Sequence, residues 1–182
     1  SLTIVNSYYA DLIVPSFQRS QILSVASSIL LILVSLFYFN LEPVNSKKAA
    51  LTGYEGLFLK DNLPTDLKLE LAWGSEMFLT ASAAASILIY LNGEVILKRG
   101  LITDQEFIPK DICLRSTDSQ KLISLVNTKF YPGKEEFDSV LKGLPSVIIY
   151  PIDKNGYIIL GGWSERCFTK SDEIWIEGWV KK

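Results

Sequence analysis

The 182-residue sequence contains no histidine, and this absence excludes several kinds of functional site. Without imidazole there is no Ser-His-Asp or Cys-His nucleophile, no histidine-ligated zinc and no histidine-ligated haem. Cysteine is also scarce, because Cys113 and Cys167 are the only two and neither belongs to a CxxC motif. Two thiols are too few for a disulfide framework, and we expect both to be reduced.

An excess of basic charge is missing as well. The 18 Lys and Arg residues are outnumbered by 20 Asp and Glu residues, so the net charge is −2 and the pI is near 5.3. A general nucleic-acid binder would present a basic surface, so this class is disfavoured. Apolar residues form 48% of the chain, enough for a hydrophobic core, and disorder is excluded. Gly161 and Gly162 lack the spacing and the lysine of a phosphate-binding loop.

Charge is absent altogether from residues 20–41, which lie between Arg19 and Glu42. As a helix this run would be about 33 Å long, against about 30 Å for the hydrocarbon core of a bilayer. A buried core helix is the alternative, whereas a cleaved signal peptide would start earlier and end in small residues. We therefore predict an N-terminal segment (1–19), a transmembrane helix (20–41), a linker (42–49) and a folded domain (50–182).

Three serines of the predicted span, Ser24, Ser28 and Ser35, would share one helical face. Small hydroxylated side chains let a partner helix approach closely and bond across the contact. Alternatively, each hydroxyl bonds back to the carbonyl four residues earlier in its own helix. Two lysines follow the span and one arginine precedes it, so the positive-inside rule places the folded domain on the cytoplasmic or stromal side.

Residues 50–182 show the pattern of an α+β domain. A helix is predicted from Pro64 to about Ala83, with Thr65 as its N-cap. Apolar runs at 86–91 and 94–98 are joined by Asn-Gly, the strongest short-range indication of a β-hairpin. A second hairpin is predicted from residues 147–150 and 157–160, and a strand from residues 122–127.

The last helix is expected to begin at Thr169, with Asp172 completing a short-armed capping box. Trp175 and Trp179 lie four residues apart on this helix and are expected to pack in the core rather than around a ligand. The order of these elements fits an antiparallel sheet with helices packed on one face. This is the order of GAF-like domains, although a fold by itself does not fix a function.

Several short motifs, spread in order over nearly the whole chain, resemble a known family. They are residues 16–20, 53–56, 70–73, 131–137, 160–162 and 166–169, together with Asp172, Trp175 and Ile176. On these motifs the sequence resembles the cofactor assembly of complex C (CCB) family of cyanobacteria and plastids. The family commonly has two membrane helices, so residues 1–9 would be the tail of a preceding helix. Cys167 stands where the family usually has glycine, and Lys134 stands where it usually has arginine.

The resemblance implies a thylakoid membrane protein with a GAF-like domain in the stroma or cytoplasm. Family members assist the attachment of haem c(i) to cytochrome b6 during assembly of the cytochrome b6f complex. The implied partners are therefore cytochrome b6 or sister assembly proteins. Relatives in the same superfamily are linked to photosystem assembly, so a stable accessory component of a photosystem core is the alternative. A third possibility is a small-molecule sensor, since GAF-like domains often bind ligands beside the sheet.

We expect a scaffold rather than an enzyme, with no catalytic residue, no metal and no bound cofactor. The acidic residues Glu135, Glu136 and Asp138 follow a turn and are expected to be exposed, without the burial that would make a general acid. A reactive role for Cys167 would need a second thiol or a base nearby, and the sequence offers neither. The folded domain should therefore purify colourless.

A candidate interaction surface is formed by aromatic residues near the turn and one cation. Its members are Phe130, Tyr131, Phe137 and Arg166. Aromatic and arginine side chains are enriched at protein interfaces, which suits an assembly factor. Core packing of the same rings is the alternative.

Overall fold

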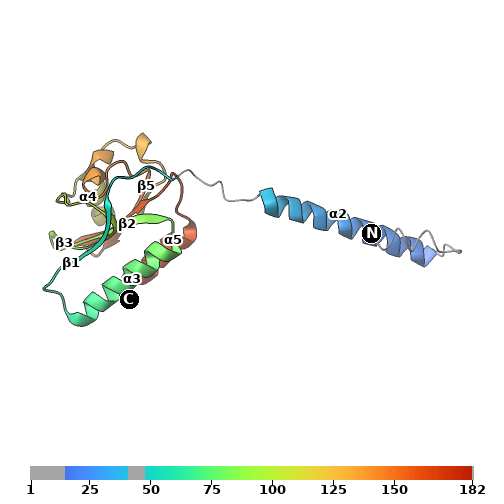
Figure 1. Cartoon of the computed structure of the whole chain (residues 1–182), viewed down its shortest axis with the longest axis horizontal. Coiled ribbons are helices and arrows are strands. Elements are labelled where there is room, and N and C mark those ends of the chain that lie inside the picture. Colours follow the sequence, from blue (N-terminus) through green and yellow to red (C-terminus); the bar gives the residue numbers. More distant parts are fainter. Residues whose placement is uncertain (1–14, 41–47, 182) are drawn as a thin grey trace. The chain divides into compact units, whose positions relative to one another are not determined.

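The computed structural model describes residues 15–40 and 48–181 (Figure 1). The chain divides into two compact units, the first holding helix α2 (Pro15–Asn40) and the second holding the folded domain. The predicted N-terminal segment up to residue 14 and the predicted linker up to residue 47 lie outside the described residues.

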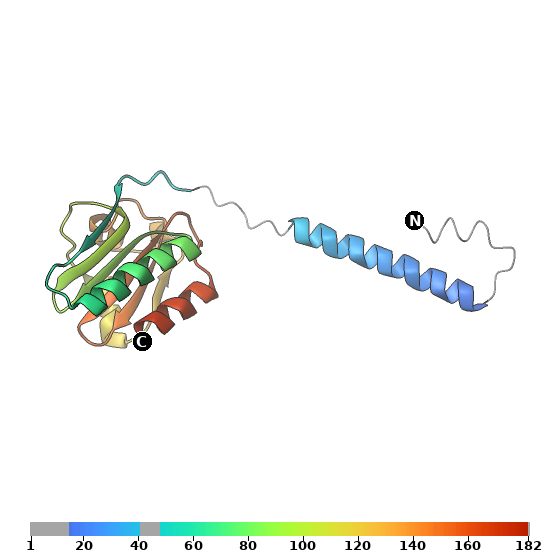
Figure 2. The same cartoon turned by 60° about the horizontal axis from the view of Figure 1, so that its bottom comes forward.

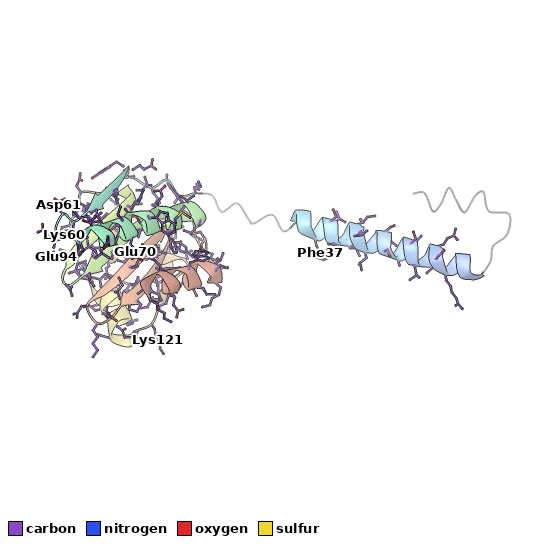
Figure 3. The ribbon with its side chains drawn as sticks, turned by 90° about the horizontal axis from the view of Figure 1, so that it is seen from below. Phe37, Lys60, Asp61, Glu70, Glu94 and Lys121 are labelled. Carbon is purple, nitrogen blue, oxygen red and sulfur yellow. The ribbon has the colours of Figure 1, made fainter. Side chains whose placement is uncertain are left out.

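Helix α2 is long and apolar enough to cross a membrane over Arg19–Phe37, by length and composition. Its apolar side chains from Ile22 to Phe37 are exposed, as a helix that meets lipid requires, and Phe37 is labelled in Figure 3. The Ser28 hydroxyl donates to the Ser24 carbonyl at 2.8 Å, so this serine bonds back within its own helix.

The domain is built on one six-stranded sheet in the order β1-β3-β2-β6-β5-β4, and every neighbouring pair is antiparallel. The strands are β1 (Tyr54–Leu59), β2 (Ala84–Leu91), β3 (Glu94–Ile102), β4 (Ile123–Leu125), β5 (Ser146–Ile152) and β6 (Gly156–Gly162). The helices are α3 (Thr65–Ala81), α4 (Asp111–Ser119) and α5 (Lys170–Val180), with 3-10 turns η1 (Thr128–Phe130) and η2 (Lys134–Ser139). The predicted α+β class with a GAF-like order is confirmed.

Successive strand residues point to opposite sides of the sheet, and the domain accordingly has two cores. On one side Ile87, Ile158 and Leu160 pack under α3 and α5. On the other side Leu88 and Ile159 pack under α4 and the 3-10 turns. The expectation of helices on one face only is wrong, because the central strands are apolar on both sides. Figure 2 shows α3 and α5 running side by side across their face.

Local sequence motifs determine the turns and the last helix as predicted. Asn92 and Gly93 have φ values of 53° and 89°, as the tight turn between β2 and β3 demands. Thr169 and Asp172 form the capping box at the start of α5. Thr65 is not the N-cap of α3, because Pro64 occupies that position and the helix has no side-chain cap.

The sequence analysis predicted neither the first strand of the sheet, β1, nor helix α4. Strand β1 pairs with β3 over six residues, and its end is held by Lys60, whose amide donates to Ile96 O at 3.0 Å. The Lys60 ammonium also forms an ion pair with Glu94, and Figure 3 shows the two residues together. Strand β1 contains Gly56 and exposed polar residues, so apolar and polar residues do not alternate clearly along it. The sequence of this segment alone therefore does not indicate a strand.

Candidate functional site

An exposed aromatic patch projects from the loops beside β4. Phe130 is 80% exposed at the end of η1, Val126 is 45% exposed, and Tyr131 and Arg166 are exposed beside them. We refer to Val126, Phe130, Tyr131 and Arg166 as the loop patch. Exposed apolar and aromatic side chains beside an arginine are a composition typical of protein interfaces.

Two loops distant in sequence are bonded together to form the loop patch. The Arg166 amide donates to the Val126 carbonyl at 2.8 Å, and Lys129 forms a 2.8 Å ion pair with Glu165. Arg166 adopts a φ of 54°, so the positive-φ residue of this turn precedes Cys167 rather than coinciding with it. These bonds hold the guanidinium-bearing loop against the aromatic loop before any partner binds.

The base of the loop patch is anchored in the core. The Thr128 hydroxyl donates to Leu144 O at 2.5 Å, and the Thr128 amide donates to Pro145 O at 3.0 Å. Asn127 caps the 3-10 turn by accepting a bond from the Lys129 amide. Phe130 therefore lies on a short turn whose backbone is bonded to the core.

Phe137, the fourth predicted member of the interaction surface, does not belong to it. Its side chain is only 2% exposed and packs in the core under α4. The 3-10 turn η2 places Phe137 inward, whereas Phe130 ends η1 and points outward. The alternative of core packing is correct for Phe137 and wrong for Phe130.

Glu136 is also misplaced by the sequence prediction, because it is buried while Glu135 is exposed. The Glu136 carboxyl group accepts bonds from the backbone amides of Lys110, Ile112 and Cys113, at 2.6, 3.1 and 3.3 Å. These amides open α4, which has no cap from its own N-cap side chain. Glu136 therefore caps a helix whose N-cap residue, Lys110, lies 26 residues earlier in the chain, which is a structural role.

The two cysteines occupy different environments. The Cys113 thiol is fully buried, and burial together with the nearby Glu136 raises the pKa of Cys113 well above its ordinary range. Cys167 is partly exposed, and its Sγ lies 3.2 Å from Ser146 Oγ. Both cysteines are free thiols, as predicted. Cys113 is a core residue, and Cys167 is the more exposed of the two.

This contrast predicts the thiol chemistry of the chain. Iodoacetamide at pH 8 should modify Cys167 at least roughly tenfold faster than Cys113, because only an accessible thiolate reacts. Mass spectrometry of peptides from the detergent-solubilised chain should find one adduct before unfolding and two in urea. Equal rates at the two cysteines in the folded chain would contradict the buried position of Cys113.

The same burial predicts a loss of stability at alkaline pH. Unfolded Cys113 loses its proton as the pH rises through its ordinary pKa of 9.0, whereas the folded thiol keeps it. Tyr157 behaves likewise above its ordinary pKa of 10.0, because burial raises the pKa of this phenol too. Unfolding then releases protons, so the free energy of unfolding must fall with rising pH above about 9. A Cys113→Ala variant should show a weaker fall in its thermal midpoint between pH 8 and 10.

A second candidate site is an open pocket of about 390 Å³ beside β3, lined by β1, the β2–β3 hairpin and residues 102–107. Some of its polar groups are paired with one another. Lys98 Nζ donates to the carbonyls of Thr103 and Gln105, and burial lowers the pKa of Lys98. The Tyr54 hydroxyl donates to Asp104, which raises the pKa of Tyr54. These bonds fasten the loop of residues 103–105 to β1 and β3.

Tyr90 and Phe107 form the inner wall of this pocket. Tyr157 stacks on Tyr90 with ring centroids 5.1 Å apart, and Phe107 meets both tyrosines edge-on. The buried Tyr157 hydroxyl has no hydrogen-bond partner among the described residues. Within residues 15–40 and 48–181 there is no group of three or more potential metal ligands.

Sequence reasoning missed an apolar surface on the outer side of α3 and α5. Trp175 is 72% exposed, contrary to the prediction that it packs in the core. Trp179 does pack, because its ring stacks on Phe78 with centroids 6.4 Å apart. On α3 Leu67 is 37% exposed, and Leu69, Trp73 and Met77 are more exposed and lie four residues apart. Their four-residue spacing could have indicated a second apolar face on this helix, distinct from the buried one.

The fold and the apolar helix define a class of protein: a GAF-like domain preceded by a helix that can span a membrane. The domain resembles the GAF domain region of a protein from Geobacter sulfurreducens, with a TM-score of 0.50 and 15% identity, over 63% of this chain and 89% of that one. It also resembles a type II free methionine-R-sulfoxide reductase from Thermoplasma acidophilum, with a TM-score of 0.48 and 17% identity, over 62% and 89% of the two chains. At 15% identity the likeness to the Geobacter domain shows the fold alone.

Within this class the chain belongs to the CCB2/CCB4 family, whose members are named for cofactor assembly of complex C and whose model matches residues 1–182. A relative in Arabidopsis thaliana is the chloroplastic protein CCB4, which carries the same cofactor assembly of complex C name. The two sequences are 24% identical over 173 residues, covering 88% of this chain and 58% of the relative. The chain therefore spans less than two thirds of the length of this relative.

Proposed function

We propose that this chain is a membrane-anchored, non-catalytic assembly factor of the thylakoid that assists the attachment of haem c(i) to cytochrome b6. The observation that carries the proposal is the family match over the whole chain, together with a loop patch suited to a protein partner. Cytochrome b6 or a sister assembly protein is the proposed partner. Helix α2 is the proposed anchor, and the domain is proposed to lie on the stromal or cytoplasmic side.

The loop patch is the proposed contact for this partner. Phe130 supplies a large rigid apolar anchor, and Arg166 supplies an exposed cation that can pair with an acidic or carbonyl group. The bonds between Val126 and Arg166 and between Lys129 and Glu165 hold the two loops in one arrangement. A scaffold needs such a preorganised surface rather than perturbed catalytic groups. The serine face of α2, Ser24, Ser28 and Ser35, is a proposed second contact within the membrane.

Affinity capture of the tagged full chain tests the proposal. Phe130→Glu should reduce the captured partner by roughly tenfold or more, because a buried aromatic anchor at an interface is replaced by a charge. The matched control is Ile108→Glu, since Ile108 is 61% exposed outside the loop patch and should tolerate the same change. Unchanged capture by Phe130→Glu would remove the loop patch from the interface.

Stoichiometry in the same experiment separates the two candidate functions. An assembly factor should be substoichiometric to the mature complex and should enrich cytochrome b6 that lacks haem c(i). A chain recovered in equal amounts with a mature photosystem would instead be a stable accessory component, and the assembly proposal would fail.

A further inference from the structure

The open pocket beside β3 is lined by four aromatic side chains. Tyr54 and Phe58 come from β1, where they are 50% and 47% exposed, and Tyr90 and Phe107 come from β2 and from the loop after β3. We call these four residues the aromatic lining. The pocket volume of about 390 Å³ lies within the range of about 300–1,000 Å³ that small-molecule sites occupy.

The strand register explains how β1 contributes two rings to the same pocket. Phe58 is paired with Lys98, and Lys98 with Leu88, so Phe58 lies on the side of the sheet that faces α4. Tyr54 is four residues earlier on the same strand and therefore points to this side too. Gly56 lies between them and has no side chain, and a Cβ there would lie only 3.4 Å from the Tyr54 ring. Glycine at this position thus keeps the strand between the two rings clear.

The charged side chains that line the pocket are mainly acidic. Glu94, Asp104 and Glu106 are acidic, and Lys98 is the one basic residue among the described residues that line the pocket. Glu94 forms an ion pair with Lys60, which leaves the carboxylates of Asp104 and Glu106 against the single ammonium group of Lys98. Two negative charges against one positive charge give the lining an excess of one negative charge.

The three remaining charged groups differ in what they bond. The Lys98 ammonium group donates to the backbone carbonyls of Thr103 and Gln105, at 3.3 and 2.7 Å, and is held against the loop. Asp104 accepts a hydrogen bond from the Tyr54 hydroxyl. Glu106 is exposed, and its carboxylate forms no hydrogen bond or ion pair with the described residues. Glu106 is therefore the carboxylate that a ligand can pair with at no cost to the bonds of the loop.

We propose that this pocket binds an organic cation, that is, an ammonium or guanidinium group on an apolar stem. Aromatic rings attract such a cation through their negative faces, and the apolar stem gains from contact with the same rings. One positive charge on the ligand balances the excess negative charge of the lining. Phe58 and Tyr90 are the proposed aromatic contacts, and Glu106 is the proposed counterion. The proposal is independent of the assembly role, which depends on the loop patch beside β4.

Calorimetric titration of the full chain in a nonionic detergent tests the proposal. The first pair of probes is choline and 3,3-dimethylbutan-1-ol, which have the same shape but differ in charge. Choline should bind saturably at one site per chain and roughly tenfold more tightly than the uncharged alcohol. The second pair is N-acetylarginine amide and the uncharged N-acetylcitrulline amide. Tighter binding of the arginine probe than of choline would indicate a side chain of a partner protein as the source of the cation, and the reverse would indicate a free quaternary ammonium compound.

Two substitutions locate the binding in this pocket. Glu106→Gln should weaken the binding of the preferred cation by roughly fivefold, because a carboxylate close to the charge is lost. The matched control is Glu55→Gln, which makes the same change at an exposed residue of β1 that points to the other side of the sheet. Phe58→Leu keeps an apolar side chain but removes the ring, and should weaken binding by a similar factor. Circular dichroism should show the same fold for all three variants.

Three results would overturn the proposal. They are the absence of saturable binding by both cations, equal binding of each cation and its uncharged counterpart, and equal effects of Glu106→Gln and Glu55→Gln. None of these results bears on the capture of a partner through Phe130, so the two proposals fail separately.

Discussion

Replacing Glu136 by alanine should lower the free energy of unfolding of the domain by about 3–4 kcal/mol. Glu136 is 2% exposed, and its carboxyl group accepts bonds from three backbone amides at the start of α4. Alanine leaves these donors without an acceptor, opens a cavity beside Cys113 and removes the favourable interaction of an acidic group with the helix N-terminus. In detergent, the thermal midpoint should fall by about 10 °C or more.

Two variants determine how much of this effect belongs to the cap. Glu135→Ala removes the neighbouring acidic residue, which is exposed, and should change the stability by less than about 0.5 kcal/mol. Glu136→Gln keeps the size and one acceptor oxygen, and should cost about 1–2 kcal/mol. If Glu135→Ala and Glu136→Ala had equal effects, the buried cap would be refuted.

Gly100→Ala should destabilise the sheet by about 3 kcal/mol. Gly100 lies within β3 at a φ of 89°, and an added Cβ would lie 2.4 Å from the carbonyl oxygen of Ala85 on β2. The obstacle is backbone, so β2 and β3 must separate where Gly100 pairs with Ser86. Urea unfolding followed by tryptophan fluorescence should show a clearly lower midpoint.

Gly93→Ala is the matched control for Gly100→Ala. Gly93 has the same φ of 89° but lies in the β2–β3 turn, where an added Cβ meets nothing within 4 Å. Gly93→Ala should lower the free energy of unfolding by only about 1 kcal/mol, which is the cost of placing alanine at a positive φ. The difference between the two losses of unfolding free energy measures the cost of the clash between the added Cβ at Gly100 and the Ala85 carbonyl oxygen. Equal losses would show that the close approach of β2 and β3 at Gly100 is not maintained in solution.

The β2–β3 turn and the cap of α5 could be predicted from the sequence because their causes are local. The Asn92-Gly93 turn needs two residues that tolerate positive φ, and the start of α5 needs Thr169 and Asp172 three residues apart. Each of these devices uses atoms within a few residues of one another. The 22-residue uncharged run is equally local, because its length and composition alone make it a candidate span.

The candidate sites were harder to predict because burial depends on segments that are distant in the chain. Nothing near Phe130 and Phe137 distinguishes the two rings, yet one is 80% exposed and the other 2% exposed. The same holds for Trp175 and Trp179, which are four residues apart on one helix. Trp175 is exposed, whereas Trp179 packs against Phe78. Helix α4 escaped prediction because its capping group comes from Glu136, far along the chain.

By itself the sequence determined the absence of histidine chemistry, the uncharged run able to cross a membrane, the two hairpins and the capped last helix. The tertiary structure alone decided that both sides of the sheet are covered, that Glu136 and Phe137 face inward, and that Phe130, Trp73 and Trp175 remain in water. The physical reason is the range of the interactions. Backbone conformation and hydropathy act within one segment, whereas burial requires two segments to meet, as when the Arg166 amide bonds to Val126 and completes the loop patch.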